Sequence, residues 1–321
     1  MKLGVMMALF QDRSWEEALD IVKEFGAEAV EPGSGNFVGN AHCNPDELLA
    51  DEKKMKAWQK AVESRGLFVS ALACHGNPLH PDKSFAEANA HTIRQTILLA
   101  EKLGIPCITT FAGLPGGCEG DKMPNWVTCP WPPYFSEIVA WQWKDKVLPF
   151  WKEMVGFARQ HGMKHICFEM HPGDWIYCPE RLLNLRAALG PEICCNFDPS
   201  HLFWQGIDPI EAVRKLGEAI QHTHAKDTRI DPVNARWNGV LDTKSYADEI
   251  NRSWIFRAVG YGHGVEFWKD LVSTLRLVGY DYVLSIEHED SLMSAKEGLS
   301  KAVALLKEAM MTTKPGAAWW V

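Results

Sequence analysis

Short apolar runs alternate with amphipathic stretches along the whole chain. The apolar runs predict buried strands, and there are eight of them: LGVMM at 3–7, AEAVE at 27–31, FVSALAC at 68–74, CITTF at 107–111, HICFE at 165–169, ICCNFD at 193–198, QHTHA at 221–225 and YVLSIE at 282–287. Eight such runs, each followed by a helical pattern, are typical of parallel strands closed into a barrel. We therefore expect an α/β fold, a single (β/α)8 TIM barrel over residues 1–321.

The amphipathic stretches contain recognisable helix boundaries. In SWEEALDIVKEFG, Ser14 and Glu17 have the spacing of a capping box, and Gly26 ends the helix. ANAHTIRQTILLAEKLG, FWKEMVGFARQHG and FWKDLVSTLRLVG also end in a glycine that suits a C-cap before the next strand. An open doubly wound sheet is the alternative architecture, but its glycine fingerprint, GxGxxG, does not follow the first run.

Two connections are longer than a barrel requires. Residues 112–149 follow the fourth run and are rich in Pro, Trp and Gly, and residues 228–263 follow the seventh run. Both leave from the carboxyl ends of strands, where barrels carry their active sites. We interpret them as lid-like insertions that cover a substrate, with contacts in a homo-oligomer as the alternative.

Charge and cysteine content narrow the function classes. The chain has 33 Lys and Arg against 41 Asp and Glu, a formal net charge of −8, which argues against a nucleic-acid partner. The apolar N-terminal stretch is too short for a signal peptide or a membrane span, so we expect a cytoplasmic protein without a membrane partner. The nine cysteines contain no CxxC pair, and we expect most of them to be small core residues.

Residues of the types that bind metal ions lie at or near the ends of four consecutive predicted strands. Glu169, Asp198 and Glu287 end the fifth, sixth and eighth runs, and His224 lies near the end of the seventh. Because the carboxyl ends of parallel strands meet at one face of a barrel, we expect the four side chains to converge. Three carboxylates and one imidazole suit one hard divalent ion, for which Mn²⁺ is expected and Mg²⁺ or Co²⁺ are alternatives.

Each of these residues also has a structural interpretation. An acidic residue after a strand is often the N-cap of the next helix, which applies best to Asp198 because Pro199 follows it. A lone histidine such as His224 is more often a buried core residue. Further polar residues lie close to the four in sequence, and we expect them to contact substrate or to orient the metal ligands: His75, His171, His201, Lys226, Asp227 and Arg229.

These motifs resemble those of the xylose isomerase-like TIM-barrel superfamily. This is the sugar isomerase and epimerase group that also contains inosose isomerases, inosose dehydratases and endonuclease IV. The resemblance covers nearly the full chain, and its matching pieces are FEMHPG with Glu169, NFDPSH with Asp198 and His201, HTHAKD with His224 and Asp227, and LSIEHED with Glu287. Endonuclease IV uses a richer ligand set with a histidine after the fourth strand, where this chain has Thr109, Thr110 and Phe111.

The resemblance also implies catalytic roles. In the ketose 3-epimerases of the group, the glutamates that correspond to Glu169 and Glu287 face opposite sides of the sugar and exchange a proton with carbon. The resemblance implies the same exchange here and substrate contact for His201. The expected catalytic residues are therefore Glu169, Glu287 and His201.

Three functions are consistent with these expectations. The first is a divalent-metal-dependent sugar isomerase or epimerase that works through an enediolate. The long insertions resemble a longer-looped branch, and imply as an alternative a lyase or deglycosidase that eliminates the aglycone from a 3-keto-glycoside, together with a small partner subunit. A third interpretation is a non-catalytic sugar-binding protein. In each case the expected ligand is a small sugar or glycoside.

Overall fold

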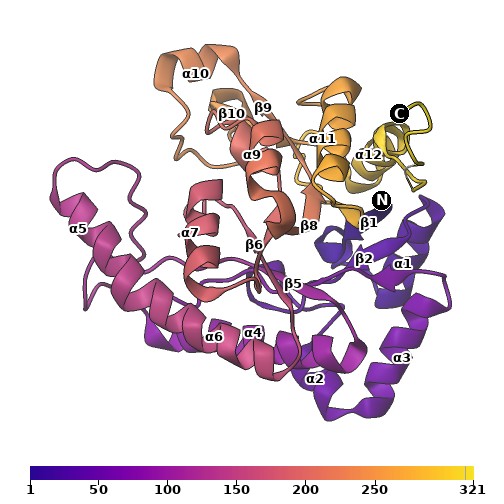
Figure 1. Ribbon diagram of the computed structural model, residues 1–321, viewed down its shortest axis with the longest axis horizontal. Helices are drawn as coiled ribbons and strands as arrows, with labels where there is room; N and C mark the ends of the chain where they lie inside the picture. Colours follow the sequence, from indigo (N-terminus) through magenta and orange to yellow (C-terminus); the bar gives the residue numbers. More distant parts are fainter. Residues whose placement is uncertain (315) are drawn as a thin grey trace.

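A sheet of short parallel strands forms the centre of the computed structural model, which describes residues 1–314 and 316–321. In this part of the chain the sheet has nine strands in the order β3-β2-β1-β11-β8-β7-β6-β5-β4, and it forms a nearly closed barrel with helices around it (Figure 1). The strands are β1 (Lys2–Met6), β2 (Ala29–Glu31), β3 (Phe68–Val69), β4 (Leu72–Ala73), β5 (Cys107–Thr110), β6 (His165–Glu169), β7 (Ile193–Phe197), β8 (Ile220–Ala225) and β11 (Val283–Ile286). The predicted TIM barrel is confirmed.

The third predicted strand is broken in two. β3 pairs with β2, whereas β4 pairs with β5. Backbone hydrogen bonds from Ser70 N to Val30 O (2.9 Å) and from Cys74 N to Thr109 O (2.8 Å) continue both ladders past the break. The prediction of one unbroken strand over 68–74 is therefore wrong, but this stretch still joins the two edges of the sheet. The eight predicted runs occupy the eight positions around the barrel.

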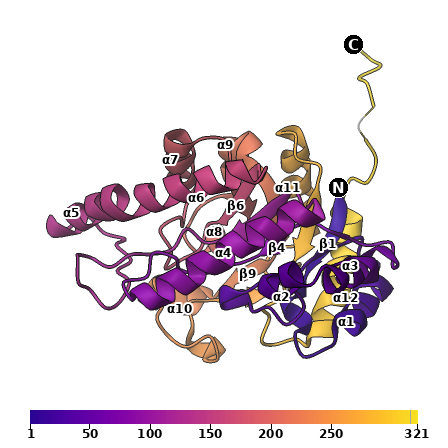
Figure 2. The ribbon, with the colours of Figure 1, turned by 90° about the horizontal axis from the view of Figure 1, so that it is seen from below.

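Helices surround the barrel and connect its strands (Figure 2). They are α1 (Trp15–Glu24), α2 (Pro45–Ala50), α3 (Glu52–Glu63), α4 (Lys83–Leu103), α5 (Tyr134–Trp141), α6 (Leu148–Gln160), α7 (Pro179–Leu189), α8 (Ser200–Phe203), α9 (Pro209–Leu216), α10 (Pro232–Asn238), α11 (Val265–Leu277) and α12 (Ala295–Ala309). The predicted capping box is present, because the Ser14 hydroxyl accepts from Glu17 N and the Glu17 carboxylate accepts from Ser14 N. Gly104 ends α4 with φ of 67°, a left-handed conformation that glycine adopts without strain.

The two long connections contain more regular structure than the sequence predicted. Residues 112–133 are irregular, but the rest of the first connection forms α5, a π-helical turn over Gln142–Val147 and the start of α6. In the second connection, β9 (Asp227–Ile230) pairs antiparallel with β10 (Trp254–Arg257), and α10 lies between them in sequence. Their role as lids stays a prediction.

The two connections meet in an apolar cluster beside the barrel mouth. Trp204 and Trp254 stack with ring centroids 4.7 Å apart, and Phe256 packs against them. Trp126, from the irregular part of the first connection, packs on the same cluster. Buried aromatic contacts of this kind couple segments through both burial and ring geometry. Residues 112–133 and the β9–β10 hairpin are therefore packed onto one another.

The cysteines divide into two groups by exposure. All nine are free, and six of them are buried, as expected of core residues. Cys107, Cys167 and Cys194 pack together at the amino-terminal side of the barrel. Cys118 and Cys129 are exposed, and both belong to residues 112–133. None of the helices in the described residues combines the length and apolar character needed to cross a membrane.

Candidate metal centre

Four candidate ligands converge at the carboxyl end of the barrel. Glu169 is the last residue of β6, Asp198 directly follows β7, His224 is the fifth residue of β8 and Glu287 directly follows β11. One ligand atom of each residue lies within 4.8 Å of those of the other three. Three of the side chains are buried, while Glu287 is 18% exposed. The group is thus enclosed by the barrel and open to solvent beside Glu287.

The imidazole of His224 shows that this group fits a metal ion. Its Nδ1 atom is buried and lies 3.1 Å from both Glu169 Oε2 and Glu287 Oε2, yet its geometry gives it no hydrogen-bond partner among the described residues. Its Nε2 atom lies 3.0 Å from a different carboxylate, that of Glu31. A buried ring nitrogen aimed at carboxylates without a hydrogen bond is a suitable donor for a cation. The ligand set, one nitrogen and three carboxylates, suits a hard divalent ion.

Lys226 and His201 supply positive charge to the same group. Lys226 Nζ lies 2.8 Å from Glu287 Oε2 and 3.2 Å from Asp198 Oδ2, and its side chain is fully buried. His201 Nε2 lies 3.0 Å from Glu169 Oε1 and 3.2 Å from Asp198 Oδ2. Burial and the Lys226 ammonium oppose protonation of His201, but the two carboxylates outweigh them and raise its pKa to about 9. Protonated side chains therefore balance the carboxylates.

The same charges keep the carboxylates ionised. Burial acts to raise the pKa of Glu169, but the His224 charge and the hydrogen bond from His201 outweigh it and hold the pKa well below its usual range. Burial likewise opposes ionisation of Glu287, and the Lys226 ammonium overcomes it to lower the pKa. Ionised carboxylates are the form that binds metal ions, so these side chains are prepared for coordination.

Several residues expected near the substrate do surround the group. His75 Nε2 lies 3.1 Å from Glu169 Oε2. His171 makes an edge contact with His201, with ring centroids 4.3 Å apart. Ring contacts continue on both sides, from His75 through Phe111 to His171 and from His201 to Phe256. These rings form a continuous chain beside the carboxylates and provide an apolar surface next to the candidate metal site.

Asp227 and Arg229 lie away from the ligand group. The Asp227 carboxylate accepts backbone N–H groups of Gly260, Gly262 and His263, so it holds the turn after β10. Arg229 is exposed on β9. The antiparallel hairpin explains this placement, because β9 leaves the barrel directly after Lys226. The geometry gives neither residue a place beside the four ligands.

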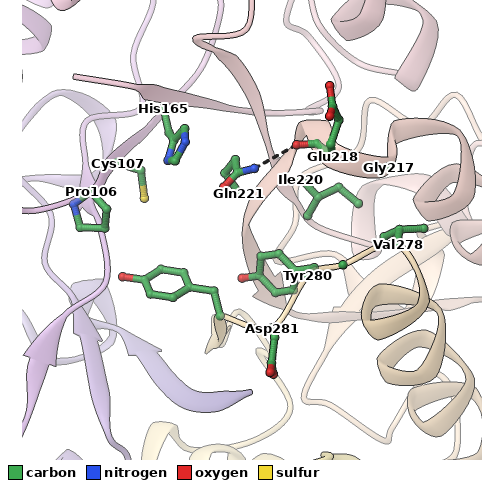
Figure 3. Close-up of a pocket in the computed structure, with 12 residues that line it drawn as sticks. Pro106, Cys107, His165, Gly217, Glu218, Ile220, Gln221, Val278, Tyr280 and Asp281 are labelled. Atoms are coloured by element: carbon green, nitrogen blue, oxygen red, sulfur yellow. Dashed lines mark hydrogen bonds between the residues drawn. The ribbon is translucent and has the colours of Figure 1, made fainter. Parts of the chain in front are cut away.

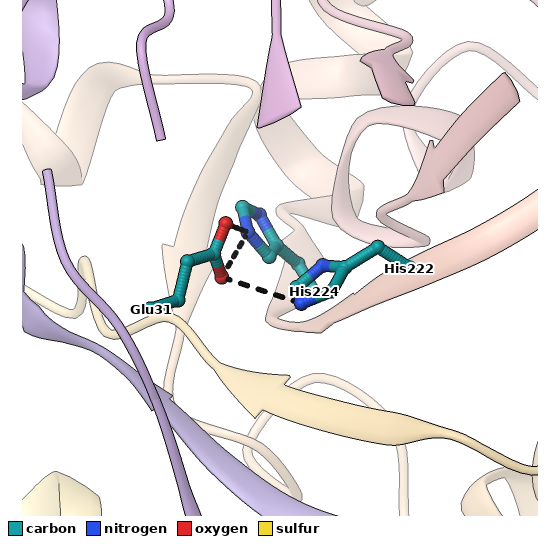
Figure 4. A group of neighbouring side chains, drawn as sticks. All are labelled: Glu31, His222 and His224. Carbon is teal, nitrogen blue, oxygen red and sulfur yellow. Dashed lines mark hydrogen bonds and ion pairs between the residues drawn. The ribbon is translucent and has the colours of Figure 1, made fainter. Parts of the chain in front are cut away.

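Sequence reasoning missed two buried polar residues beneath the ligands, Glu31 and Asn196. Glu31 ends β2 and points toward His224 and His222, as Figure 4 shows. Asn196 donates from Nδ2 to Glu169 Oε2 over 3.1 Å and accepts from His222 Nδ1 over 2.9 Å. Glu31 ends its strand as Glu169 does, and Asn196 precedes Asp198 by two residues, so it faces the same side of the strand. Both signals were available in the sequence.

A separate cavity of about 450 Å³ lies at the opposite end of the barrel. It is lined by residues that precede or begin strands, among them Pro106, His165, Gln221 and Tyr280 (Figure 3). In TIM barrels the amino-terminal face contributes to stability, and catalytic groups lie at the carboxyl face. We therefore place the candidate site at the four ligands and not in this cavity.

Sequence comparison identifies the family. A family model described as "Xylose isomerase-like TIM barrel" matches residues 19–309. The chain belongs to the xylose isomerase-like TIM-barrel family. This result confirms the resemblance inferred from the strand-end motifs.

Relatives within the xylose isomerase-like family include both uncharacterised proteins and enzymes. The chain is 38% identical over 310 residues to the "Uncharacterized protein YfiH" of Bacillus subtilis (strain 168), covering 96% of this chain and 99% of that protein. It is 25% identical over 179 residues to an inosose dehydratase of Geobacillus thermodenitrificans (strain NG80-2), covering 55% of this chain and 56% of that protein.

Solved structures confirm the xylose isomerase-like fold. A xylose isomerase domain protein from Planctomyces limnophilus aligns with a TM-score of 0.64 at 19% identity, covering 96% of both chains. D-psicose 3-epimerase from Clostridium cellulolyticum H10 aligns with a TM-score of 0.60 at 13% identity, covering 96% of this chain and 98% of that chain. The named relatives include a dehydratase and an epimerase, which supports the prediction of an enzyme.

Proposed function

We propose that this protein is a divalent-metal-dependent sugar isomerase or epimerase. The observation that carries the proposal is the convergence of Glu169, Asp198, His224 and Glu287, with the buried Nδ1 of His224 aimed into the group. The similarity to D-psicose 3-epimerase supports a carbohydrate substrate. Mn²⁺ is the proposed ion, with Mg²⁺ or Co²⁺ as alternatives.

Glu169 and Glu287 have different environments. These suit the two steps of a proton exchange, removal of a proton from carbon and its return. When bound, the metal ion would polarise a carbonyl and its neighbouring hydroxyl and so favour the enediolate. Glu287 is the exposed carboxylate, and Lys226 holds one of its oxygens at 2.8 Å, so we assign it the removal of the proton from carbon. Glu169 is ionised and lies 3.0 Å from protonated His201, so the returning proton would pass from His201 through Glu169 to carbon, while the partly exposed Glu287 gives its proton to solvent.

Solvent exchange tests this proposal directly. The metal-free protein and the Mn²⁺-loaded protein are incubated in D₂O with a panel of ketoses, and deuterium at the carbon next to the carbonyl is measured by NMR. We expect incorporation only with Mn²⁺, loss after EDTA and recovery on readdition of Mn²⁺. A Mn²⁺-loaded protein that exchanges no proton with any ketose contradicts the proposed isomerase or epimerase activity.

The chain of aromatic rings supports a second candidate, a lyase that eliminates the aglycone from a 3-keto-glycoside. Phe111, Phe256 and the histidines between them offer an apolar wall that suits an aryl group better than a free sugar. Burial and the nearby His201 charge lower the pKa of His171 to about 3, and its Nδ1 lies 2.7 Å from Pro172 O. A neutral His171 therefore keeps Nε2 as a hydrogen-bond acceptor for a substrate hydroxyl.

Product analysis separates the candidates. Release of the aglycone from a 3-keto-glycoside, alone or with a small partner subunit, would favour the lyase, whereas deuterium incorporation with retention of the aglycone favours the isomerase or epimerase. A non-catalytic sugar-binding protein would bind the sugar without either change.

The free cysteines are consistent with a cytoplasmic location, which we propose together with a homo-oligomeric assembly.

A further inference from the structure

Glu31 is a buried carboxylate directly behind a candidate metal ligand. It ends β2 and has no solvent exposure. Its Oε1 atom accepts a hydrogen bond from the Thr109 hydroxyl and its Oε2 atom accepts one from the Ser285 hydroxyl, each over 2.7 Å. Burying a carboxylate is unfavourable unless hydrogen bonds compensate, and here residues of β5 and β11 supply them. Figure 4 shows that the carboxylate faces His224.

The contact between Glu31 and His224 favours a proton on Nε2 of the ring. His224 Nε2 lies 3.0 Å from Glu31 Oε2 and 3.2 Å from Asn196 Nδ2, which donates to Glu169 Oε2. An ionised carboxylate accepts hydrogen bonds and does not donate them, so Nε2 carries the proton in this contact. The lone pair of the neutral ring is then on Nδ1, which faces Glu169 and Glu287. The contact with Glu31 thus accounts for both the orientation of the His224 ring and its tautomer.

Glu31, His222 and His224 also lie close enough together to hold a metal ion, but the hydrogen bonds of Glu31 and His222 make this group the less suitable one. Both carboxylate oxygens of Glu31 already accept hydroxyl hydrogen bonds, and the residue lies below the ligands with no exposed surface. The second histidine near it, His222, makes its own hydrogen bond from Nδ1 to Asn196 Oδ1. Glu31 therefore acts through His224 and does not contact the substrate.

We propose that Glu31 is a positioning residue that holds His224 in the tautomer that presents Nδ1 to the metal ion. The proposal rests on the proposed function, because it assumes that the four-residue group binds a divalent ion. Outer partners of metal-bound histidines typically contribute about 10- to 100-fold to metal affinity. In Glu31→Gln the amide can donate to Nε2 as well as accept from it, so the variant no longer excludes the other tautomer.

Mn²⁺ titrations followed by EPR test the contribution to affinity. The wild type, Glu31→Gln and Thr109→Val are compared after metal removal, with CD spectra and melting temperatures as checks of folding. We expect Glu31→Gln to weaken Mn²⁺ binding by about 10- to 100-fold. Thr109→Val removes one hydrogen bond to Glu31 but keeps the carboxylate, so its effect should be much smaller. If Glu31→Gln does not fold, Glu31→Asp replaces it, because the shorter side chain moves the carboxylate away from His224 Nε2, and weaker Mn²⁺ binding is expected.

The ¹⁵N chemical shifts of the His224 ring provide a readout that a merely structural role would not change. In the metal-free proteins at the same pH, we expect Nε2 of the neutral ring to be protonated in the wild type and a mixture of the two tautomers in Glu31→Gln. Wild-type Mn²⁺ affinity and an unchanged tautomer in Glu31→Gln would overturn the proposal. If the wild type binds no Mn²⁺, the proposed function fails, whereas a tautomer change in the metal-free variant would still support the role of Glu31.

Discussion

Glu287 differs from the other three candidate ligands because solvent reaches it. Its carboxylate shares the Lys226 ammonium with Glu289, whose side chain is 49% exposed and is not one of the four ligands. Glu287→Gln should leave the fold intact but reduce deuterium incorporation into substrate by about 10²- to 10⁴-fold, the usual contribution of a general base. NMR of the product in D₂O measures the effect.

Glu289→Gln is the matched control for Glu287. It removes a carboxylate from the same ammonium without removing a ligand, so most of the exchange activity should remain. Equal losses in both variants would show that the charge around Lys226, and not the proton transfer by Glu287, determines the rate. Unchanged exchange in Glu287→Gln would reject its role as the base.

Lys226 is a buried cation whose three carboxylate partners include two of the candidate ligands, Asp198 and Glu287. Without metal, Lys226→Met leaves Asp198 and Glu287 less compensated, and loss of one partner of a buried ion pair costs about 3–5 kcal/mol. Added Mn²⁺ would restore positive charge at the same place. We expect a lower melting temperature for the metal-free variant and a larger Mn²⁺-induced increase than in the wild type, measured by calorimetry.

A surface lysine provides the control for this experiment. Lys269 pairs with Glu308 while 40% exposed, and pairs of that kind contribute about 0–1 kcal/mol. Lys269→Met should therefore leave both the metal-free melting temperature and its Mn²⁺-induced increase nearly unchanged. Identical Mn²⁺-induced increases in Lys226→Met and the wild type would contradict the electrostatic competition between Lys226 and the metal ion.

At the level of single residues, position at a strand end indicated the candidate ligands but not the buried residues that form hydrogen bonds with them. The sequence predicted that Glu169 and Asp198 would lie together, and they do. Glu31 ends its run as Glu169 does, but it was missed because that run was read only as a strand, and Asn196 was missed because it stands inside an apolar run. The substrate contact of Asp227 stays a prediction. That its carboxylate would accept from the turn after β10 could not be predicted, because a one-dimensional pattern does not show where such a hairpin leads.

At the level of elements, Trp126 links the two long insertions. It packs on the cluster of Trp204, Trp254 and Phe256. Trp126→Ala should loosen both insertions together because its ring contacts couple them. Hydrogen–deuterium exchange should therefore become faster within 112–133 and within 239–256.

Trp131 belongs to the same irregular segment but is 72% exposed, so it is the matched control. Trp131→Ala should leave amide exchange in both insertions at the wild-type rate. If Trp126→Ala accelerates exchange only within 112–133, then the two insertions are not coupled through this cluster, whatever their proximity.

The sequence predicted the insertions as loops because Pro, Trp and Gly are dense in them. It did not predict that residues 134–147 would extend α6 toward its amino end, or that β9 and β10 would pair. The break between β3 and β4 was also missed. Local propensity does not reveal such features, since they depend on which neighbouring strand or helix is available for pairing and packing.

At the level of the whole molecule, the four ligands join strands that are far apart in sequence. The four ligands, which span positions 169 to 287, come together only in the folded chain, so the unfolded chain does not bind the ion in this way. Binding therefore stabilises the fold, by about 2.7 kcal/mol when the ion concentration is 100 times the dissociation constant. We expect Mn²⁺ to raise the melting temperature and EDTA to reverse the increase, as measured by calorimetry.

This stabilisation should depend on pH with a definite sign. Burial opposes protonation of His224, but Glu31 and the two ligand glutamates outweigh it and raise its pKa well above the usual value. Mn²⁺ must displace a proton from this ring, so the Mn²⁺-induced increase in melting temperature should become smaller as pH falls and larger as pH rises through neutrality. An increase that is independent of pH across neutrality would argue against coordination by His224.

The overall architecture was predictable because eight apolar runs with helices between them allow few arrangements. The preferred substrate could not be predicted from the sequence, because the insertions that surround the site have no repeating pattern to interpret.

The distribution of cysteines has a practical use. Cys118 and Cys129 are exposed, and both belong to residues 112–133, whereas Cys178 is half-buried and the other six are buried. A maleimide fluorophore should therefore attach mainly to this insertion without engineering of the protein. Changes in its emission on mixing with sugars would report in real time whether the insertion closes over a ligand, even before the natural sugar is known.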